Sequence, residues 1–408
     1  MQYVIEIDIL HLQAVFIMIK RFLASKIKEW AGQYPVITVT GPRQSGKTTL
    51  CRALFKDKPY LSLEDLDHRE FARTDPRGFL ANIPDGAVLD EIQYAPNLVS
   101  YIQTRVDERQ QPGMFVLTGS RQFEMMESVS QSLAGRTAVA RLLPFSFGEL
   151  YAHTPPPSID AMLYAGFYPR IHDRNLNPTE ALSFYLATYI ERDVRQILAV
   201  SDLDRFSTFI RLCAGRTGQL LNMQSIGGEC GVTHNTIKSW LSVLQASGII
   251  KLLQPWHTNL GKRLVKSPKL YFLDTGLACF LLGIHKPEHL TGHPLRGALF
   301  ETFVVSEAYK QHDHAGLQER LWFYRDSHGN EVDLLAGSET DFSAWEVKAS
   351  MTVSTEFFNG IEKLSKIINS LKNKAILYGG NARQKRQGFD IIPWNQIDQV
   401  FLPCTSSS

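Results

Sequence analysis

Cysteine is scarce in this 408-residue chain, and neither sign of charge predominates. The five cysteines lie far apart and form no Cys-x-x-Cys pair, which argues against a disulfide framework or a zinc ribbon and favours a reducing cytoplasm. Forty-three Lys and Arg residues stand against 41 Asp and Glu residues, so the formal net charge is only +2. The overall charge therefore favours no class of partner, and a nucleic-acid surface would need a local cluster of basic residues.

A long uninterrupted hydrophobic run is also missing. The apolar amino terminus is interrupted by Glu6, Asp8 and His11, no basic residue precedes it, and no small-residue cleavage site follows. We therefore expect neither a membrane span nor a signal peptide. A helix can begin near Met18, so we expect residues 1–17 to be an N-terminal extension that the folded protein does not need.

Length and composition predict a globular protein of two or three domains, because 44% of the residues are hydrophobic and can fill several cores. The first domain is expected over residues 18–150, where short apolar segments alternate with helical stretches. This alternation predicts an α/β fold with a parallel sheet. The expected strands are 35–40, 60–63, 87–90 and 115–118.

Three consecutive prolines at 155–157 mark the end of this first region. A mainly helical domain is expected over 151–290, with apolar residues recurring at intervals of three and four from Phe184 onward. A third domain is expected over 291–402, with one helix, three strands, a second helix and a last strand. Residues 403–408 form a polar tail.

The clearest motif is Gly-Pro-Arg-Gln-Ser-Gly-Lys-Thr, which lies between an apolar strand and a helical segment. This is the phosphate-binding loop in its strand-to-helix context. Gly41 and Gly46 let the backbone curl so that its N–H groups face the phosphates. Lys47 would reach the β and γ phosphates, and Thr48 would offer its hydroxyl to Mg²⁺. The residues expected to bind ATP are Gly41, Pro42, Arg43, Gln44, Ser45, Gly46, Lys47, Thr48 and Thr49.

Two carboxylates follow the apolar segment that ends at Asp90. Asp90 would hold Mg²⁺ through its water shell, and Glu91 would polarise the water that attacks the γ phosphate. The next strand ends in Thr118-Gly-Ser120, so either hydroxyl could sense that phosphate. Together with the phosphate-binding loop, these residues favour hydrolysis of ATP over binding alone.

The order of the motifs GPRQSGKTTL, VLDEIQ, LTGSRQ, SLAGRTA, LLPFSFGEL and YIERDVRQI resembles a family of uncharacterised prokaryotic AAA-type P-loop ATPases. In that family the ATPase module is followed by a winged helix and a restriction-endonuclease-like domain, and the likeness runs from about Met18 through almost the whole chain. The resemblance implies this fold and an ATPase activity. It also makes Arg136 a candidate arginine finger, delivered to a neighbouring subunit of a homo-oligomer; an ordinary surface or ion-paired arginine is the alternative.

A helix-turn-helix pattern lies in the middle region. Residues 222–230 would form a short helix, Gly231 and Val232 the turn, and Thr233 the cap of a second helix that ends near Ser247. Four side chains would lie near the exposed start of this second helix and could enter a DNA groove. They are His234, Asn235, Lys238 and Ser239.

A basic stretch follows, which we interpret as a wing that contacts DNA phosphates. It contains Lys262, Arg263, Lys266 and Lys269. The alternative is a winged helix used only for packing or oligomerisation, with a solvated basic strand.

The last region carries a second set of ionisable residues. Glu301 is expected on an amphipathic helix, Asp333 on a strand, and Glu346 and Lys348 on the next strand, with a spacing of two that puts both on one face. The order is similar to the PD-(D/E)XK nuclease fold, with Val332 in place of the usual proline before Asp333. Glu301, Asp333 and Glu346 would hold Mg²⁺, and Lys348 would position the attacking water.

Two functions remain open at this point. One is an ATP-dependent enzyme that cleaves or otherwise acts on DNA. The other is a nucleotide-gated regulatory protein whose nuclease-like domain only binds DNA or another protein.

Overall fold

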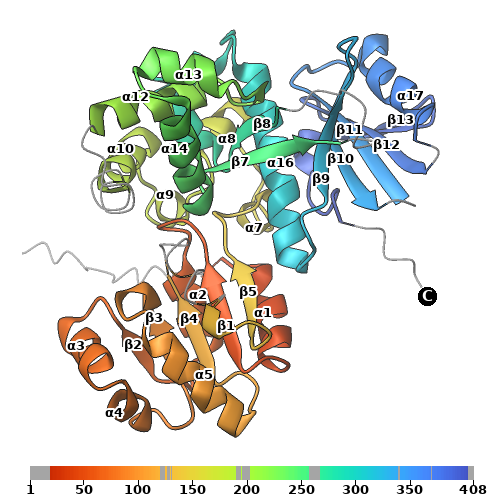
Figure 1. The fold of residues 1–408 in the computed structure, drawn as a ribbon. Helices are drawn as coiled ribbons and strands as arrows, with labels where there is room; N and C mark the ends of the chain where they lie inside the picture. The colour runs from red at the N-terminus through yellow and green to blue at the C-terminus, as the bar shows by residue number, and fades with distance from the viewer. Residues whose placement is uncertain are drawn as a thin grey trace, which may run out of the picture.

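The computed structural model describes residues 19–119, 125, 129, 131–189, 194, 203–256, 267–338, 341–368 and 370–402. Figure 1 shows two bodies. One is the parallel sheet of the amino-terminal region with its helices, and the other contains the regions that follow it. The two bodies meet near α7 and the lower end of α16. Residues 1–17, Ser120, residues 257–266 and Cys404 lie outside the described residues. The predictions made for them are not addressed by the structure. The segment 257–266 includes Lys262, Arg263 and Lys266 of the basic stretch, whereas Lys269 is described.

The amino-terminal region is an α/β unit whose described strands form a five-stranded, fully parallel sheet in the order β2-β3-β4-β1-β5. Its strands are β1 (Val36–Thr40), β2 (Tyr60–Ser62), β3 (Val88–Asp90), β4 (Phe115–Thr118) and β5 (Thr137–Arg141). Its helices are α1 (Leu23–Ala31), α2 (Lys47–Leu54), α3 (Leu66–Thr74), α4 (Pro76–Ala81) and α5 (Leu98–Arg109), with a 3₁₀ turn η1 (Ile92–Tyr94).

The four strands expected from the sequence are present, with ends that differ by a residue or two. Strand β5 was not expected. Its segment, Thr-Ala-Val-Ala-Arg, has small apolar residues between two polar ones, and its burial alternates, with Val139 exposed. It therefore does not show the long, strongly apolar run of a central parallel strand. The first helix begins at Leu23 and not near Met18, which corrects that expectation.

The middle region is mainly helical. Its elements are α7 (Phe147–Leu150), α8 (Ile159–Ala165), α9 (Pro169–Asp173), α10 (Pro178–Tyr189), α12 (Leu203–Ala214), β6 (Gln219–Leu220), α13 (Met223–Cys230), α14 (His234–Ala246), β7 (Ile250–Pro255), β8 (Lys269–Phe272), α15 (Thr275–Leu281) and η3 (Pro287–Leu290). The buried face of α10 contains Leu182, Tyr185 and Leu186, whereas Phe184 is 72% exposed. The apolar period expected from Phe184 was therefore assigned to the wrong face of this helix.

The helix-turn-helix expected from the sequence is present as α13 and α14. The Asn222 side chain accepts a hydrogen bond from the N–H of Ser225 at the start of α13, and the Thr233 side chain accepts one from Thr236 at the start of α14. Gly231 ends α13 in the left-handed conformation, with a φ of 65°. Trp240 of α14 packs against Phe206 and Phe209 of α12, with ring centroids 5.3 and 5.2 Å apart.

The last region begins with a 20-residue helix, α16 (Arg296–Ala315), most of which is buried. Its other elements are β9 (Leu321–Arg325), β10 (Glu331–Ser338), β11 (Asp341–Lys348), η4 (Thr355–Phe358), α17 (Asn359–Ser365), β12 (Leu371–Tyr378), β13 (Gln384–Arg386), β14 (Phe389–Pro393) and η5 (Trp394–Gln396). Three described strands, not one, therefore follow α17. We did not distinguish them in the sequence because polar residues and a turn interrupt them.

A single sheet joins the middle and last regions. Among the described residues it has nine strands in the order β13-β14-β12-β11-β10-β9-β7-β8-β6. Strand β7 of the middle region pairs in parallel with β9, so that Gln254 lies opposite Trp322 and Pro255 opposite Phe323. The sheet thus crosses the boundary that the sequence suggested at residue 290, and Figure 1 shows β7 extending from the helices toward β9 and β10.

The described cysteines Cys51, Cys213, Cys230 and Cys279 are buried free thiols. No helix among the residues that the structure describes is long and apolar enough to cross a membrane.

Candidate functional site

The phosphate-binding loop lies between β1 and α2, at the carboxyl-terminal edge of the parallel sheet. Gly41 has a φ of +142°, and a Cβ atom at this position would lie 2.0 Å from the Leu142 carbonyl oxygen, so no other residue fits. Gly46, at the start of α2, has a φ of +93°. These two glycines let the loop curl tightly against β5 while the amino-terminal end of α2 faces the loop.

Two groups in the loop lack the partners that a phosphate would supply. The buried Ser45 hydroxyl has no hydrogen-bond partner among the described residues. The ammonium group of Lys47 is 2.9 Å from the Gly41 carbonyl oxygen and 2.8 Å from that of Pro42, so it bonds to the loop itself. Burial lowers the pKa of Lys47 to about 8, although the Glu91 and Asp90 carboxylates oppose this shift. Negatively charged phosphates would favour the charged form of this lysine.

Asp90, at the end of β3, joins the loop to the neighbouring strands. Its Oδ2 atom accepts hydrogen bonds from the Thr48 hydroxyl at 3.0 Å and from the Tyr60 hydroxyl at 2.5 Å. Its Oδ1 atom accepts one from the Thr118 hydroxyl, and Asp90 is only 5% exposed. The structure therefore brings together Thr48, Asp90 and Thr118, which the sequence had placed at the ends of three different elements.

Glu91 follows directly and has left-handed backbone geometry, with a φ of 56°, which is uncommon for a residue other than glycine. Its Oε2 atom accepts a hydrogen bond from the Gln93 side-chain amide. The side-chain oxygen of Gln93, Oε1, is buried without a hydrogen-bond partner in the described part of the chain. The sharp backbone turn and the amide of Gln93 hold the Glu91 carboxylate in place beside the loop.

Sequence reasoning missed several residues that support this site. Tyr60 was seen only as a strand residue, and its role depends on the pairing of β2 with β3, where Ser62 lies opposite Asp90. Arg21 donates to the Ser45 carbonyl oxygen at 2.7 Å and to the buried carboxylate of Glu149 at 3.1 Å. Neither contact could be found in the sequence, because the partners are 24 and 128 residues apart.

The structure places Arg136 at the opposite edge of the sheet. It precedes β5, and its backbone carbonyl accepts a hydrogen bond from Val36 at the start of β1. The Arg136 guanidinium is bound to the exposed Asp107 carboxylate through two hydrogen bonds of 2.5 and 2.8 Å. Arg136 therefore does not reach the phosphate-binding loop of its own chain.

A second ionisable cluster lies on β10 and β11. Lys348 is 2.5 Å from Glu346 and 3.5 Å from Asp333, so all three side chains lie on the same face of the sheet. The Oδ2 atom of Asp333 also accepts a hydrogen bond of 2.9 Å from the Val347 N–H. The predicted meeting of Asp333, Glu346 and Lys348 across two antiparallel strands is present in the structure.

Glu301 joins this cluster from α16, through residues of β8 that the sequence analysis did not assign to it. The Glu301 Oε1 atom is 2.9 Å from the Lys269 ammonium group and accepts a 2.5 Å hydrogen bond from the Tyr271 hydroxyl. Lys269 also pairs with Glu331 and lies 3.8 Å from Asp333. Its side chain is 3% exposed. Lys269 was predicted to contact DNA from the wing, and its burial among carboxylates shows that this was wrong.

The alternation of Lys269 and Tyr271 within an apolar strand could have indicated that both face one side. That these two side chains lie close to residues of α16 and β10 could not have been found from the sequence, because it depends on how the sheet continues from β8 to β10.

Burial and crowding shift the pKa values in this cluster. Burial, followed by the nearby charge of Asp333, raises the pKa of Glu301 to about 7 and that of Glu346 to about 8. Burial alone would lower the pKa of Lys269, but Tyr271 and the surrounding carboxylates raise it well above its usual value. The second oxygen of Glu346 is buried and has no hydrogen-bond partner among the described residues.

No group of three or more His, Cys, Asp or Glu side chains in the described part of the chain is arranged to hold a metal ion. Two lysines lie among Glu301, Asp333 and Glu346 instead. The residue types fit a hard cation, and the unpaired oxygen of Glu346 is a suitable ligand. The three carboxylates do not, however, converge on one point as the sequence predicted.

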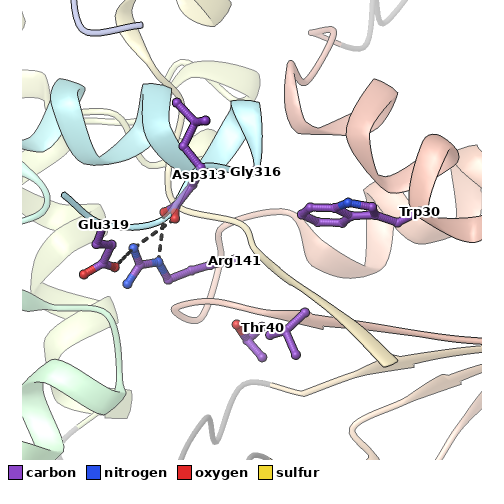
Figure 2. A pocket seen from close by; sticks show the side chains of 8 residues that line it. Trp30, Thr40, Arg141, Asp313, Gly316 and Glu319 are labelled. Carbon is purple, nitrogen blue, oxygen red and sulfur yellow. Dashed lines mark hydrogen bonds and ion pairs between the residues drawn. The ribbon is translucent and has the colours of Figure 1, made fainter. Parts of the chain in front are cut away.

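The start of the second helix of the helix-turn-helix is accessible. His234, Asn235, Lys238 and Ser239 are all exposed on α14, whereas Ile237 and Trp240 are buried. A cavity of about 350 Å³ lies between the ATP-binding unit and the end of α16. Figure 2 shows Arg141 in this cavity bound to Asp313 and Glu319, with Trp30 across from them.

The parallel sheet, the loop after its strand β1, and Asp90 at the end of β3 define an AAA-type P-loop ATPase domain. Comparison with known families agrees, because residues 33–151 match a family model described as an AAA domain. Residues 157–288 and 296–397 match two models described as domains of unknown function, DUF8612 and DUF4143.

The chain is also similar to the uncharacterized protein Rv2008c of Mycobacterium tuberculosis and to Mb2031c of Mycobacterium bovis. Each is 28% identical over 343 residues, which span 82% of this chain and 75% of the relative. Among solved structures, the Walker-type ATPase PABY2304 of Pyrococcus abyssi has 14% identity and a TM-score of 0.44, and covers 64% of this chain and 94% of its own. DnaA from Aquifex aeolicus has 15% identity and a TM-score of 0.29, and covers 55% of this chain and 85% of its own.

Proposed function

We propose that this protein couples ATP hydrolysis to an action on DNA, performed by its helix-turn-helix and by the ionisable cluster of its last region. The observation that carries the hydrolysis part is the Asp90 carboxylate, which receives the hydroxyls of both Thr48 and Thr118 in a water-poor site. In this arrangement Asp90 would hold the water shell of Mg²⁺, and the Thr118 hydroxyl beside it would sense the γ phosphate.

The residues have separate roles in this proposal. The backbone N–H groups of the loop residues 41 and 43–46, the Ser45 hydroxyl and the Lys47 ammonium bind the phosphates of ATP. Lys47 exchanges its hydrogen bonds to the loop carbonyls for bonds to phosphate oxygens. Glu91 accepts the proton of the attacking water, and Gln93 orients the Glu91 carboxylate.

Mg²⁺ fits this site, because the Thr48 hydroxyl and the Asp90 carboxylate are oxygen ligands of the kind that it prefers. Thr48 would bind the ion, and Asp90 would hold its water shell. The ion would supply positive charge to the phosphate oxygens during phosphoryl transfer.

Arg136 is a candidate for a role in a neighbouring subunit of a homo-oligomer. Its distance from its own phosphate-binding loop and its exposed position support this assignment. To act there, Arg136 would have to leave Asp107, and the ion pair between them is weak because the Asp107 carboxylate is exposed to water.

The proposal assigns DNA binding to the exposed start of α14 and DNA cleavage to the cluster around Asp333. Lys348 contacts Asp333 and Glu346 together, and this supports a role in positioning a water next to a phosphodiester. To hold the divalent cation that would polarise the phosphate, Asp333, Glu346 and Glu301 would have to converge from the positions they have in this structure.

A nicking assay tests the cleavage assignment. The full chain is incubated with supercoiled plasmid and Mg²⁺ or Mn²⁺, with and without ATP. Asp333→Ala should lose the activity, and Lys348→Met should lose it while retaining bound metal. Nicking by Asp333→Ala at the wild-type rate would show that the cleavage comes from elsewhere.

The second candidate is a nucleotide-gated regulatory protein whose last region binds DNA without cutting it. The lysines among the carboxylates favour this reading, because their ammonium groups already neutralise the cluster. No nicking under any nucleotide condition, combined with DNA binding that depends on ATP, would support this candidate.

A further inference from the structure

Lys269 connects two regions of the molecule through its charge. It lies on β8, and its ammonium group is 2.9 Å from Glu301 of α16 and 3.8 Å from Asp333 of β10. It also pairs with Glu331 of β10. The lysine belongs to the middle region, whereas all three carboxylates belong to the last region. The Lys269 side chain is 3% exposed, and its ammonium group offsets part of the negative charge of these three carboxylates.

The position of this lysine is fixed from several sides. Lys269 lies opposite Leu253 of β7 and Leu220 of β6, so its backbone is held between two strands. Its ammonium group lies 5.6 Å from the centre of the Phe323 ring. Tyr271, two residues along β8, donates its hydroxyl to the same Glu301 oxygen, so both side chains hold that carboxylate. Lys269 is therefore held in the cluster by its strand pairing and by its side-chain contacts.

The ammonium group lies between the carboxylates to which sequence analysis assigned a metal ion. Glu301 directs its Oε1 atom at Lys269, and Asp333 directs its Oδ1 atom at Lys269 and its Oδ2 atom at Lys348. A magnesium or manganese ion needs oxygen ligands at about 2.1 Å and would repel an adjacent ammonium group strongly at low dielectric. The two cations cannot occupy this space together.

We propose that Lys269 is a tethered cation that keeps divalent metal out of the cluster of Glu301, Asp333 and Glu346 while β8 holds its present position. This inference rests on the proposed function, because it concerns control of the same cluster. It explains why the three carboxylates are close in the structure yet form no metal-ready group among the described residues. The cleavage site is then closed by a residue of the DNA-binding region.

Strand β8 is suited to this role because it pairs with β7, and these two neighbouring strands of the sheet form a ribbon whose start lies beside the ATP site. Ile250 at the start of β7 pairs with Phe272, and Leu253 pairs with Lys269. Just before β7, a Cβ atom at Gly248 would lie 3.0 Å from the ring of Pro42 in the phosphate-binding loop. A shift of the loop on nucleotide binding would therefore act on the same ribbon that carries Lys269.

The test measures binding of Mn²⁺ alone to the full chain without nucleotide, by the loss of the electron paramagnetic resonance signal of free Mn²⁺. Lys269→Met should bind Mn²⁺ at least tenfold more tightly than the wild type. The added affinity should disappear in Lys269→Met/Asp333→Ala. The matched control is Lys251→Met, which removes another ion-paired lysine of the same sheet, 2.6 Å from Glu319, and should leave Mn²⁺ affinity unchanged.

Folding of each variant is checked by its melting temperature. If Lys269→Met has a lowered melting temperature, a second pair of variants replaces it. The Mn²⁺ affinity of Lys269→Met/Glu331→Gln, which loses the lysine and one of its carboxylate partners together, is compared with that of Glu331→Gln, which keeps Lys269. Arg325 lies 3.0 Å from Glu331, so this region retains a cation in both. Equal Mn²⁺ affinity within the folded pair overturns the inference.

Nicking is scored separately in the same samples. Tighter Mn²⁺ binding without any nicking supports the tethered cation and contradicts the cleavage part of the proposed function. Nicking by the wild type with no gain of Mn²⁺ affinity in Lys269→Met supports cleavage and overturns the tethered cation.

Discussion

The two ionisable sites of this protein are neutralised in different ways. In the ATP site, the buried Ser45 hydroxyl has no hydrogen-bond partner among the described residues, and the Lys47 ammonium group is bonded to carbonyl oxygens of its own loop. In the cluster around Asp333, two lysines already pair with the carboxylates. The first site therefore has bonding capacity that an anion would satisfy, and the second supplies its own counter-ions. A motif shows which residue types are present, but their pairing decides whether a ligand is needed.

The largest effect is expected for Lys47→Ala. Removing the ammonium group leaves no other cation in the buried part of the loop to bridge the β and γ phosphates, so ATP affinity should fall by about 100-fold or more. Binding of a fluorescent ATP analogue measures this. Lys56→Ala, which removes an exposed lysine just beyond α2, is the control and should bind as the wild type does. Unchanged ATP binding in Lys47→Ala would remove the ATPase assignment.

The next largest effect is expected for Glu91→Gln. This variant keeps the shape of the side chain but cannot accept a proton, so ATP should bind normally while turnover falls by about 100-fold. Gln93→Ala should reduce turnover less, because it frees the Glu91 carboxylate without removing it. Phosphate release and ATP binding are measured on the same samples. A Glu91→Gln variant with normal turnover would show that another residue activates the water.

Two arginines near the ends of β5 allow a comparison of buried and exposed ion pairs. Arg141 is bound at 2.8 Å to Asp313, whose side chain is only 12% exposed, so Arg141→Ala should lower the free energy of unfolding by about 2 to 4 kcal/mol. Urea denaturation measures this change. Arg136→Ala breaks the exposed pair with Asp107 and should leave stability nearly unchanged.

The same Arg136→Ala variant also tests the proposed role in a neighbouring subunit. Its ATPase activity should fall, and mixing it with Lys47→Ala protein, which has an intact Arg136, should restore part of the activity. An ATPase rate equal to that of the wild type at all protein concentrations would show that Arg136 only pairs with Asp107.

The smallest effect on ATP binding is expected at Gly248, which lies between the phosphate-binding loop and the β7–β8 ribbon that carries Lys269. Gly248→Ala places a methyl group against Pro42 and should weaken ATP binding several-fold. The control is Gly283→Ala, because Gly283 has a similar φ of +74° but no atom within 4 Å of the added group. Both variants carry the same kind of backbone strain, so only the contact with the loop differs. Equal ATP affinity in the two would argue that the ribbon of β7 and β8 does not sense the loop.

Local signals in the sequence were sufficient for much of the fold. Four strands of the parallel sheet follow from short apolar runs, and the helix-turn-helix follows from two side-chain caps and a left-handed glycine within a dozen residues. Strand β5 was missed because its composition is that of an edge strand. The buried face of α10 was assigned wrongly because the helix has apolar residues on more than one side, and only the neighbouring helices determine which side is covered.

The sequence by itself determined the candidate residues of both sites. The phosphate-binding loop, Asp90 and Glu91, and the order Glu301, Asp333, Glu346 and Lys348 could all be found from residue type and spacing, because a strand or helix fixes the geometry of its own neighbours. Only the tertiary structure decided what surrounds them. Lys269 lies 32 residues from Glu301 in the chain, and the pairing of β7 with β9 is what brings β8 to the last region. Charge neutralisation across such a distance depends on how strands are ordered in a sheet, and no local pattern encodes that order.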